Sequence, residues 1–412
     1  MITEKERSLT FPIAYIGLSQ IINWGALYYS LALIGPKIIA EMHWSEVFVY
    51  SGFSISAILA GLLAPITGRI IDQIGGRVIM SLGSLIGAGG LLLLSTMSST
   101  LEYIFAWMII GVSMSMSLYD SAFATIARIA GSNTRRAISS ITLLAGFSST
   151  LTWPATAYLL SFSDWRSVII FYSIIMASIC VPLLFFGLKD RSTALIDPAS
   201  QSSSLQRNEP NVTRVEIAEV ILVKIMVLLG FIAAAQGFIS NSISVHVITL
   251  FQELGLGANG AIFIGSLIGP AQVGARLIEL VFGKQIHPIK LGLITIAVFP
   301  ISFFFPVMFP SFTVTGIIFG LAYGASNGLF TIVLSMIPYS LFGSRGYGQK
   351  LGSIAAPTLL VKAVAPALFG ALLTLLGPHF SLSILFFISL LICFAMLKLA
   401  KLVKNFSSIS VI

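Results

Sequence analysis

Charged residues are scarce in this chain. Of its 412 residues, 9% are charged and 57% are apolar, whereas a water-soluble domain carries about 25% charged residues. So little charge cannot cover a soluble surface. The 36 glycines and 16 prolines are spread through apolar runs, which excludes collagen-like and disordered chains. The composition therefore indicates a polytopic membrane protein.

Several kinds of chemistry are also missing. The two cysteines, Cys180 and Cys393, lie deep in apolar stretches and indicate neither a disulfide framework nor a CxxC metal site. The four histidines lack metal-ligand spacing, there is no Walker loop, and the apolar runs hold no cluster of nucleophile and base. We therefore expect no metal, no cofactor, no direct use of ATP and no enzymatic activity.

Long apolar runs are abundant instead. A spanning helix needs about 20 apolar residues, and a sliding window predicts two sets of six such helices. The first set covers 11–36, 46–67, 78–97, 103–127, 137–161 and 167–188, and the second covers 217–248, 259–280, 290–309, 312–338, 351–376 and 379–402. We predict an all-α membrane protein with an N-terminal six-helix bundle over 1–188, a cytoplasmic linker over 189–216 and a C-terminal six-helix bundle over 217–412.

The loop charges predict the orientation. With the N-terminus inside, eighteen Lys and Arg residues fall on the inner side and only Lys37 and Arg166 on the outer side. Cytoplasmic loops carry the excess of basic residues, so both termini and the linker are expected in the cytoplasm. The net charge of +8 thus reflects basic loops, and we expect no nucleic-acid partner. The first apolar run is too long for a signal-peptide core.

The two halves are related by internal similarity. Gly111 in the fourth predicted span matches Gly320 in the tenth, and Pro154 in the fifth matches Pro366 in the eleventh. Duplicated halves with a substrate site at their interface are typical of many secondary transporters.

One loop carries a specific motif. The segment 68–77, GRIIDQIGGR, lies between the second and third predicted spans. Gly68 lets two helix backbones approach closely, and Asp72 offers a carboxylate to the N-terminus of a neighbouring helix. Gly75 allows a tight turn. Arg77 can anchor at the lipid headgroups or pair with an acid.

This segment resembles the signature loop of the major facilitator superfamily, with Gln73 in place of the usual basic residue. The resemblance implies two pseudo-symmetric six-helix bundles that rock about a midplane site, and secondary active transport of a small solute by alternating access. At residues 23–29 (NWGALYY), 119–123 (YDSAF) and 269–273 (GPAQV), the chain resembles a bacterial branch of this superfamily with unassigned substrates. We expect a monomer in the bacterial inner membrane. Some relatives export metalloid or drug-like compounds, and others resemble monocarboxylate carriers. The Gly-Pro pattern of many drug/proton antiporters is absent, since Trp153 precedes Pro154.

Polar residues inside the spans are the candidates for substrate contact. In the superfamily, the first, fourth, seventh and tenth helices line the central cavity, and each of these spans has a polar stripe here. The candidate substrate-binding residues are Asn23, Trp24, Tyr28, Asp120, Gln236, Asn241, Tyr323, Asn327 and Lys362. The alternative is that such side chains only join helices by hydrogen bonds.

Two ionisable residues are the sharpest candidates, because a charge inside the membrane usually faces a cavity or a partner. Three roles are open for Asp120: a proton carrier, a counter-charge for a cationic substrate, or a structural acid held in an ion pair or in hydrogen bonds. Three are open for Lys362: receiving an anionic substrate, pairing with Asp120 across the two halves, or a snorkelling or structural role. Arg276 and Glu279 lie three residues apart and are expected to be the second half's counterpart of the loop latch formed by Gly68, Asp72, Gly75 and Arg77.

We therefore expect a transporter with protons as the coupling ion and a small-molecule substrate. The alternatives are an exporter of a metalloid or drug-like compound, and a non-transporting solute sensor. A sensor usually carries a soluble output domain, whereas the longest polar segment here, 189–214, has 26 residues, which is below the size of a stable domain.

Overall fold

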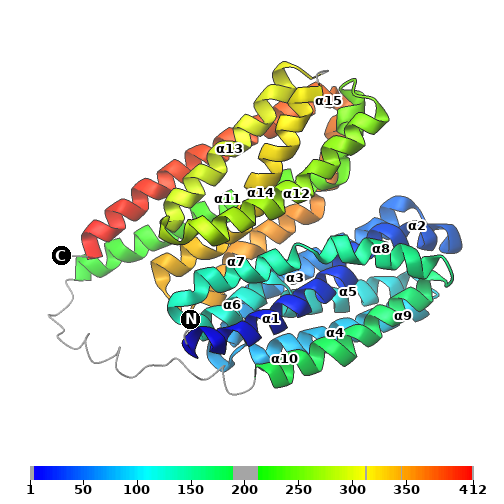
Figure 1. The fold of residues 1–412 in the computed structure, drawn as a ribbon, viewed down its shortest axis with the longest axis horizontal. Helices are drawn as coiled ribbons and strands as arrows, with labels where there is room; N and C mark the ends of the chain where they lie inside the picture. Colours follow the sequence, from blue (N-terminus) through cyan, green and yellow to red (C-terminus); the bar gives the residue numbers. More distant parts are fainter. Residues whose placement is uncertain (1–3, 189–211, 311–312, 345, 411–412) are drawn as a thin grey trace. The chain divides into compact units, whose positions relative to one another are not determined.

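Helices make up the whole regular structure of the described chain. The computed structural model describes residues 4–188, 212–310, 313–344 and 346–410, and every regular element in these ranges is a helix (Figure 1). The described residues fall into two compact units. The first comprises those of Met1–Ser192 with Pro338–Val364, and the second comprises those of Thr193–Ile337 with Ala365–Ile412.

The helices follow one another along the chain with few interruptions. In the N-terminal part they are α1 Glu4–Trp24, η1 Gly25–Tyr29, α2 Leu31–Met42, α3 Glu46–Ile74, α4 Gly76–Thr96, α5 Thr100–Ser117, α6 Tyr119–Ala130, η2 Gly131–Asn133, α7 Thr134–Ala145, α8 Ser148–Leu160, α9 Trp165–Ile175, η3 Met176–Cys180 and α10 Val181–Gly187. They continue as α11 Val212–Glu253, α12 Ala258–Phe282, η5 Gly283–Gln285, α13 Pro288–Met308, α14 Thr313–Phe342 and α15 Tyr347–Ser410.

Every predicted span coincides with a helical segment. Among the described residues, nine helical stretches are long and apolar enough to cross a membrane. The predicted spans 11–36 and 137–161 are each divided into shorter helices. The last two predicted spans both lie in α15, where Gly377 has a non-helical backbone (φ 78°, ψ 170°). The predicted linker begins at residue 189, and its residues 189–211 lie outside the described ranges, whereas its last residues already belong to α11.

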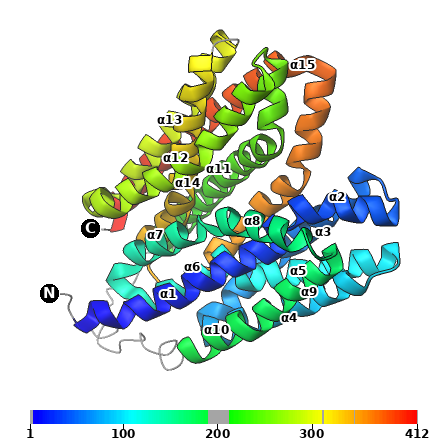
Figure 2. The same cartoon turned by 45° about the vertical axis from the view of Figure 1, so that its right-hand side comes forward.

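Small residues let the helices of each unit approach closely. In the first unit, α4 packs against α5, α9 and α10 (Figure 2). A Cβ added to Gly83 of α4 would lie 2.6 Å from the Met116 Cβ of α5, and one added to Gly87 would lie 2.3 Å from the Ser113 hydroxyl. Since lipid tails are as apolar as side chains, close packing of this kind drives helix association in membranes.

The second unit repeats this packing. Gly316, Gly320, Gly324 and Gly328 recur at every fourth position of α14, and an added Cβ at each would collide with α12. A Cβ on Gly320 would lie 2.9 Å from the Ile264 carbonyl oxygen of α12, and one on Gly111 of α5 would lie 2.7 Å from the Ser56 carbonyl oxygen of α3. The matched glycines thus make matched contacts, which supports the predicted relation between the halves.

Two glycines of α4 test this packing directly. Gly83→Ala should lower the stability of the protein by roughly 1–3 kcal/mol, because the new methyl group overpacks the contact with Met116. Gly89→Ala is the matched control, since no atom lies within 4 Å of its added Cβ and Ala favours a helix over Gly by about 1 kcal/mol. Thermal unfolding of both purified variants, followed by intrinsic fluorescence, measures the difference. Equal melting temperatures would contradict the packing argument.

Candidate functional site

The predicted fourth span is broken in the middle. We expected one helix over 103–127, but α5 ends at Ser117, Leu118 is extended (φ −90°, ψ −164°), and α6 begins at Tyr119. The serines around the break bond to the backbone: the Ser117 hydroxyl donates to the Ser113 carbonyl (2.8 Å) and the Ser121 hydroxyl to the Ser115 carbonyl (2.7 Å). Serine hydroxyls compete with the helical hydrogen bonds in this way.

Two amide side chains of α1 compensate for the break. Gln20 Nε2 donates to the Ser117 carbonyl oxygen at 2.7 Å, and Asn23 Nδ2 lies 3.5 Å from the same oxygen and 3.2 Å from the Ser84 hydroxyl. Both side chains are fully buried. A carbonyl oxygen can only accept, so the NH₂ group of each amide must face it. An unsatisfied carbonyl in hydrocarbon costs several kcal/mol, and the two amides remove that cost.

The oxygens of these two amides, and the indole nitrogen of the residue after Asn23, lack hydrogen-bond partners in the part of the chain that the structure describes. Gln20 Oε1, Asn23 Oδ1 and the Trp24 indole nitrogen are buried and have no hydrogen-bond partner among the described residues. Buried polar groups almost always have a partner. Three such groups on one stretch of α1, directly beside the broken helix, therefore point to a ligand or water that donates to the amide oxygens.

An aromatic wall adjoins these polar groups. The segment η1 is a π-helix in which the Ser30 N–H donates to the Gly25 carbonyl at 2.9 Å, and π-bulges occur frequently at functional sites. The ring of Trp24 lies 5.0 Å from that of Tyr119 and 5.3 Å from that of Tyr28. Tyr28 also meets Phe53 edge-to-face at 5.0 Å. Of the predicted residues, Asn23, Trp24 and Tyr28 are thus brought together with the break, and Tyr119 joins them.

Asp120 lies in the first turn of α6, directly after the break. A helix N-terminus favours a carboxylate, and Lys362 of α15 supplies an opposite charge that interacts with it electrostatically. Lys362 belongs to the second half of the sequence but to the first compact unit. The Ser54 hydroxyl of α3 donates to the neighbouring Ala363 carbonyl at 2.8 Å, which fixes this part of α15 against α3.

The other predicted substrate-binding residues lie in the second unit. Gln236 of α11 donates through Nε2 to Asn327 Oδ1 of α14 at 2.6 Å, and Asn241 of α11 is buried. Tyr323 is 1% exposed and its ring stacks on Phe319, with centroids 5.2 Å apart. Gln236 and Asn327 are therefore brought together, whereas Tyr323 lies in an aromatic cluster. Their contact with a solute stays a prediction.

The signature loop holds the start of α15. Asp72 accepts the backbone N–H of Gly348 through Oδ1 and that of Gln349 through Oδ2, both at 2.8 Å. A Cβ on Gly68 would lie 2.0 Å from the Gly348 carbonyl oxygen, so only glycine permits this approach of α3 to α15. Gly75 has a φ of 86°, which the tight turn requires. The structure thus places Asp72 at a helix N-terminus.

The basic residues near this loop bind backbone groups. Arg77 donates through Nε to the Phe185 carbonyl at 2.6 Å, and its guanidinium lies 4.2 Å from the centre of the Phe185 ring. Arg77 therefore binds a backbone carbonyl and an aromatic ring, whereas the sequence suggested the lipid headgroups or an acidic side chain as its partner. Arg128, which the sequence analysis did not single out, donates to the Ile71 carbonyl (2.9 Å) and to the Asp72 carbonyl. A cation is favourable at a helix C-terminus, here that of α3.

The predicted latch pair of the second unit is buried. Arg276 and Glu279 of α12 are 6% and 5% exposed. Arg276 donates through Nε to the Gly328 carbonyl of α14 at 3.1 Å. The arginine thus ties α12 to α14, and a role of the pair in conformational change stays a prediction.

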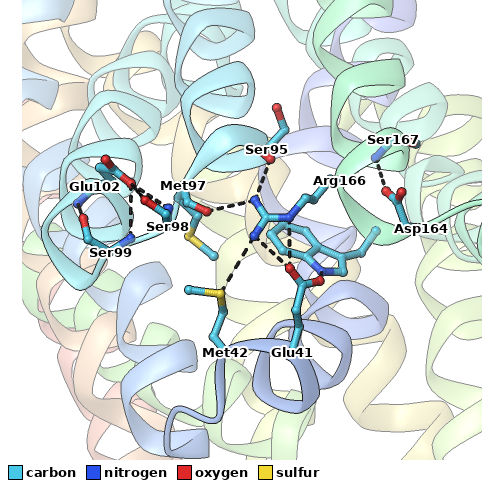
Figure 3. A network of polar contacts seen from close by, with 11 residues as sticks. Glu41, Met42, Ser95, Met97, Ser98, Ser99, Glu102, Asp164, Arg166 and Ser167 are labelled. Atoms are coloured by element: carbon cyan, nitrogen blue, oxygen red, sulfur yellow. Dashed lines mark hydrogen bonds and ion pairs between the residues drawn. The ribbon is translucent and has the colours of Figure 1, made fainter.

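A second polar network joins the other ends of the first unit's helices (Figure 3). Arg166 forms an ion pair with Glu41 (2.9 Å) and donates to the Ser95 and Met97 carbonyls (2.8 and 2.9 Å). The Trp165 indole N–H donates to Glu41 Oε2 at 2.5 Å. This network connects the C-terminal ends of α2 and α4 to the start of α9. From the loop charges, this is the expected outer side.

Within the described ranges, no group of three or more His, Cys, Asp or Glu side chains is arranged to hold a metal ion.

The amide support of the broken helix predicts a stability loss. Gln20→Leu leaves the Ser117 carbonyl with only the longer Asn23 contact, so unfolding free energy should fall by about 1–3 kcal/mol, the cost of a buried unsatisfied acceptor. Ser19→Ala is the matched control, because Ser19 is equally buried and bonds only to the Ile16 carbonyl of its own helix. Thermal melts compare the two. If Gln20→Leu melts no lower than Ser19→Ala, the break does not depend on this amide.

The outer network predicts an acid-dependent contribution to stability. The hydrogen bond from Arg166, followed by that from Trp165, holds the pKa of Glu41 below its usual 4.5. The stabilisation is therefore complete above pH 4.5 and is lost as the pH falls through the lower folded-state pKa. Glu41 is largely exposed, so the contribution stays under about 1 kcal/mol.

The variant Glu41→Gln removes this titration. Its melting temperature should fall less steeply between pH 5 and 3 than that of the wild-type protein. Parallel pH profiles for wild type and Glu41→Gln would show that the ion pair contributes nothing.

Comparison with solved structures shows the fold. The proton:xylose symporter XylE bound to 6-bromo-6-deoxy-D-glucose is 14% identical, with 96% of each chain covered and a TM-score of 0.70. The human organic anion transporter MFSD10 (TETRAN) is 14% identical, with 96% of this chain and 100% of that chain covered and a TM-score of 0.62. A double Trp mutant of XylE is 15% identical, with 95% and 94% covered and a TM-score of 0.65.

The sequence itself matches a family model. No curated protein matches this chain by sequence, but the family model of the Major Facilitator Superfamily matches residues 16–343. This match confirms the resemblance of the segment 68–77 and, with the solved structures, the predicted all-α fold class. The chain belongs to the major facilitator superfamily and is a multi-pass membrane transporter.

Proposed function

We propose that this protein is a secondary active transporter that moves a small organic solute by alternating access, coupled to protons. The observation that carries the proposal is the pair of buried, unpartnered amide oxygens of Gln20 and Asn23 beside a broken helix. A broken helix inside a membrane is tolerated where it lines a cavity or is buried in protein. In many transporters such breaks form the substrate and ion sites.

The arrangement favours a solute with hydrogen-bond donors. Such a solute donates to Gln20 Oε1 and Asn23 Oδ1 and accepts from the Trp24 indole N–H. Its apolar face packs on Trp24 and Tyr28, whose rings meet edge-to-face. A solute that supplies these hydrogen bonds is selected over one that leaves the buried groups unpaired, because an unpaired buried polar group is costly.

Asp120 is the proposed proton carrier. A carboxylate here attracts Lys362, and protonation removes that attraction. The affected part of α15 is the one that the Ser54 hydroxyl of α3 holds through the Ala363 carbonyl, further along the helix than the first turn that Asp72 binds. Proton binding at Asp120 therefore weakens one of the contacts that keep this segment in place, which couples protonation to movement of α15. XylE is, by its description, a proton symporter, which is consistent with this coupling.

An organic anion is the second candidate substrate. Lys362 carries the positive charge that such a solute needs, and MFSD10 is described as an organic anion transporter. In this case Lys362 binds the solute's acid group in place of Asp120. A metalloid or drug-like compound and a sensor without transport are the other outcomes of the test below.

The cellular setting is proposed from the loop charges and the family resemblance. We place the protein in a bacterial inner membrane as a monomer, with both termini in the cytoplasm. The latch role of Gly68, Asp72, Gly75 and Arg77 and that of Arg276 and Glu279 belong to the same proposal.

Flux measurements in proteoliposomes test the proposal. A thermal-shift screen of metabolites, metalloid oxyanions and drug-like compounds selects the solute, which is then radiolabelled. Wild-type protein should accumulate or expel it when a pH gradient is imposed. Asp120→Asn should lose at least tenfold of this pH-driven flux but keep solute exchange without a gradient, because the neutral side chain resembles the protonated state.

Matched variants separate the alternatives. Asp164→Asn should transport normally, since Asp164 only caps α9 and Asn caps equally well. Lys362→Gln should abolish binding of an organic anion but not of a neutral or cationic solute. Unchanged pH-driven flux in Asp120→Asn would exclude Asp120 as the proton carrier, and solute binding without any flux would indicate a sensor.

A further inference from the structure

A cavity of about 340 Å³ lies between α1 and α7, apart from the broken helix. Its polar side is formed by Thr10 of α1, the N-cap residue Asn133 of α7, and Arg136 and Ser140 within α7. The two helices lie side by side near the chain's N-terminus (Figure 2). All of these residues belong to the first unit.

The polar side of the cavity is suited to an anion. Arg136 is exposed, and a guanidinium is the side chain best suited to bind phosphate. Asn133, the N-cap residue of α7, lines the cavity and makes no side-chain capping bond to the first turn, and a helix N-terminus favours negative charge. An arginine with hydrogen-bond donors around it matches the oxygens of a phosphate group.

The other side of the cavity is apolar and closed. Ile13, Ala14 and Leu144 line it, and a Cβ on Gly17 would lie 2.4 Å from the Leu144 side chain. One turn further along α1, the contact continues with α8, where the Ser148 hydroxyl donates to the Ile21 carbonyl at 2.7 Å. The helices are therefore in direct contact deeper along α1, and the cavity is a wedge at their ends.

The surroundings of the cavity favour a membrane ligand. Phe11 and Leu18, on the same helix as Ile13 and Ala14, are 56% and 43% exposed, as expected for side chains that face acyl chains. The wedge lies at the helix ends that the loop charges place on the cytoplasmic side. Basic pockets between helices on that side bind anionic lipid headgroups.

We propose that this wedge binds an anionic phospholipid of the cytoplasmic leaflet. Its phosphate contacts Arg136 and the start of α7, and its glycerol and first methylenes pack on Ile13, Ala14 and Leu144. A bound lipid joins α1 to α7, and therefore stabilises the first unit. The proposal does not depend on the identity of the transported solute.

Lipid titration of the delipidated full-length protein tests this site. Short-chain phosphatidylglycerol is added in detergent, and the melting temperature and the number of bound lipids by native mass spectrometry are recorded. The wild-type protein should be stabilised by phosphatidylglycerol and bind it at least fivefold more tightly than Arg136→Gln does. Arg69→Gln is the matched control, because Arg69 is also an exposed arginine of the first unit but does not line the cavity.

A second variant separates the shape of the wedge from its charge. Ala14→Phe keeps every charge and fills the apolar side, so it should also weaken phosphatidylglycerol binding at least fivefold. Equal binding by wild type and both variants would overturn the proposal. Equal stabilisation by phosphatidylcholine would overturn recognition of the negative charge, and equal stabilisation by inorganic phosphate would show a simple anion site in place of a lipid site.

Discussion

The hydrocarbon of a membrane offers no hydrogen bonds, so every backbone carbonyl and N–H within it must find a partner in the protein. The break between α5 and α6 frees the Ser117 carbonyl, and Gln20 and Asn23 of α1 satisfy it. This support makes the break possible, and the break in turn places Asp120 at the start of a helix. The other oxygens of the two amides, Gln20 Oε1 and Asn23 Oδ1, are left buried without a hydrogen-bond partner among the described residues.

The signature loop and the broken helix act on two successive parts of one helix, α15. Asp72 holds its first turn, Gly68 permits the close contact with α3, and the charge of Asp120 acts on Lys362 further along. These contacts all lie within the first compact unit. A change in the charge of one carboxylate can therefore alter how a whole helical segment is held, without a separate signalling element.

Features that depend on local chemistry could be predicted from the sequence. The length of the apolar runs predicted the membrane spans. The motif 68–77 predicted a close helix contact at Gly68, a helix N-terminus at Asp72 and a tight turn at Gly75. The break at Leu118 could not be predicted, because no proline or glycine marks it and hydropathy does not report backbone angles; the serines around it were the only signal. The ion pair of Glu41 with Arg166 could not be predicted either, because the two residues lie 125 positions apart in the sequence. Helical periodicity places Tyr323 on one face of a helix but does not show that it packs among phenylalanines.

Solute binding at the broken helix can be observed by ¹⁹F NMR of protein labelled with 5-fluorotryptophan. The chain has five tryptophans, of which Trp24 lies at the break and Trp44 and Trp165 lie elsewhere. Trp24→Phe assigns its resonance. A transported solute should shift the Trp24 resonance with the concentration dependence of transport and leave that of Trp165 in place. Transport with an unchanged Trp24 resonance would contradict it.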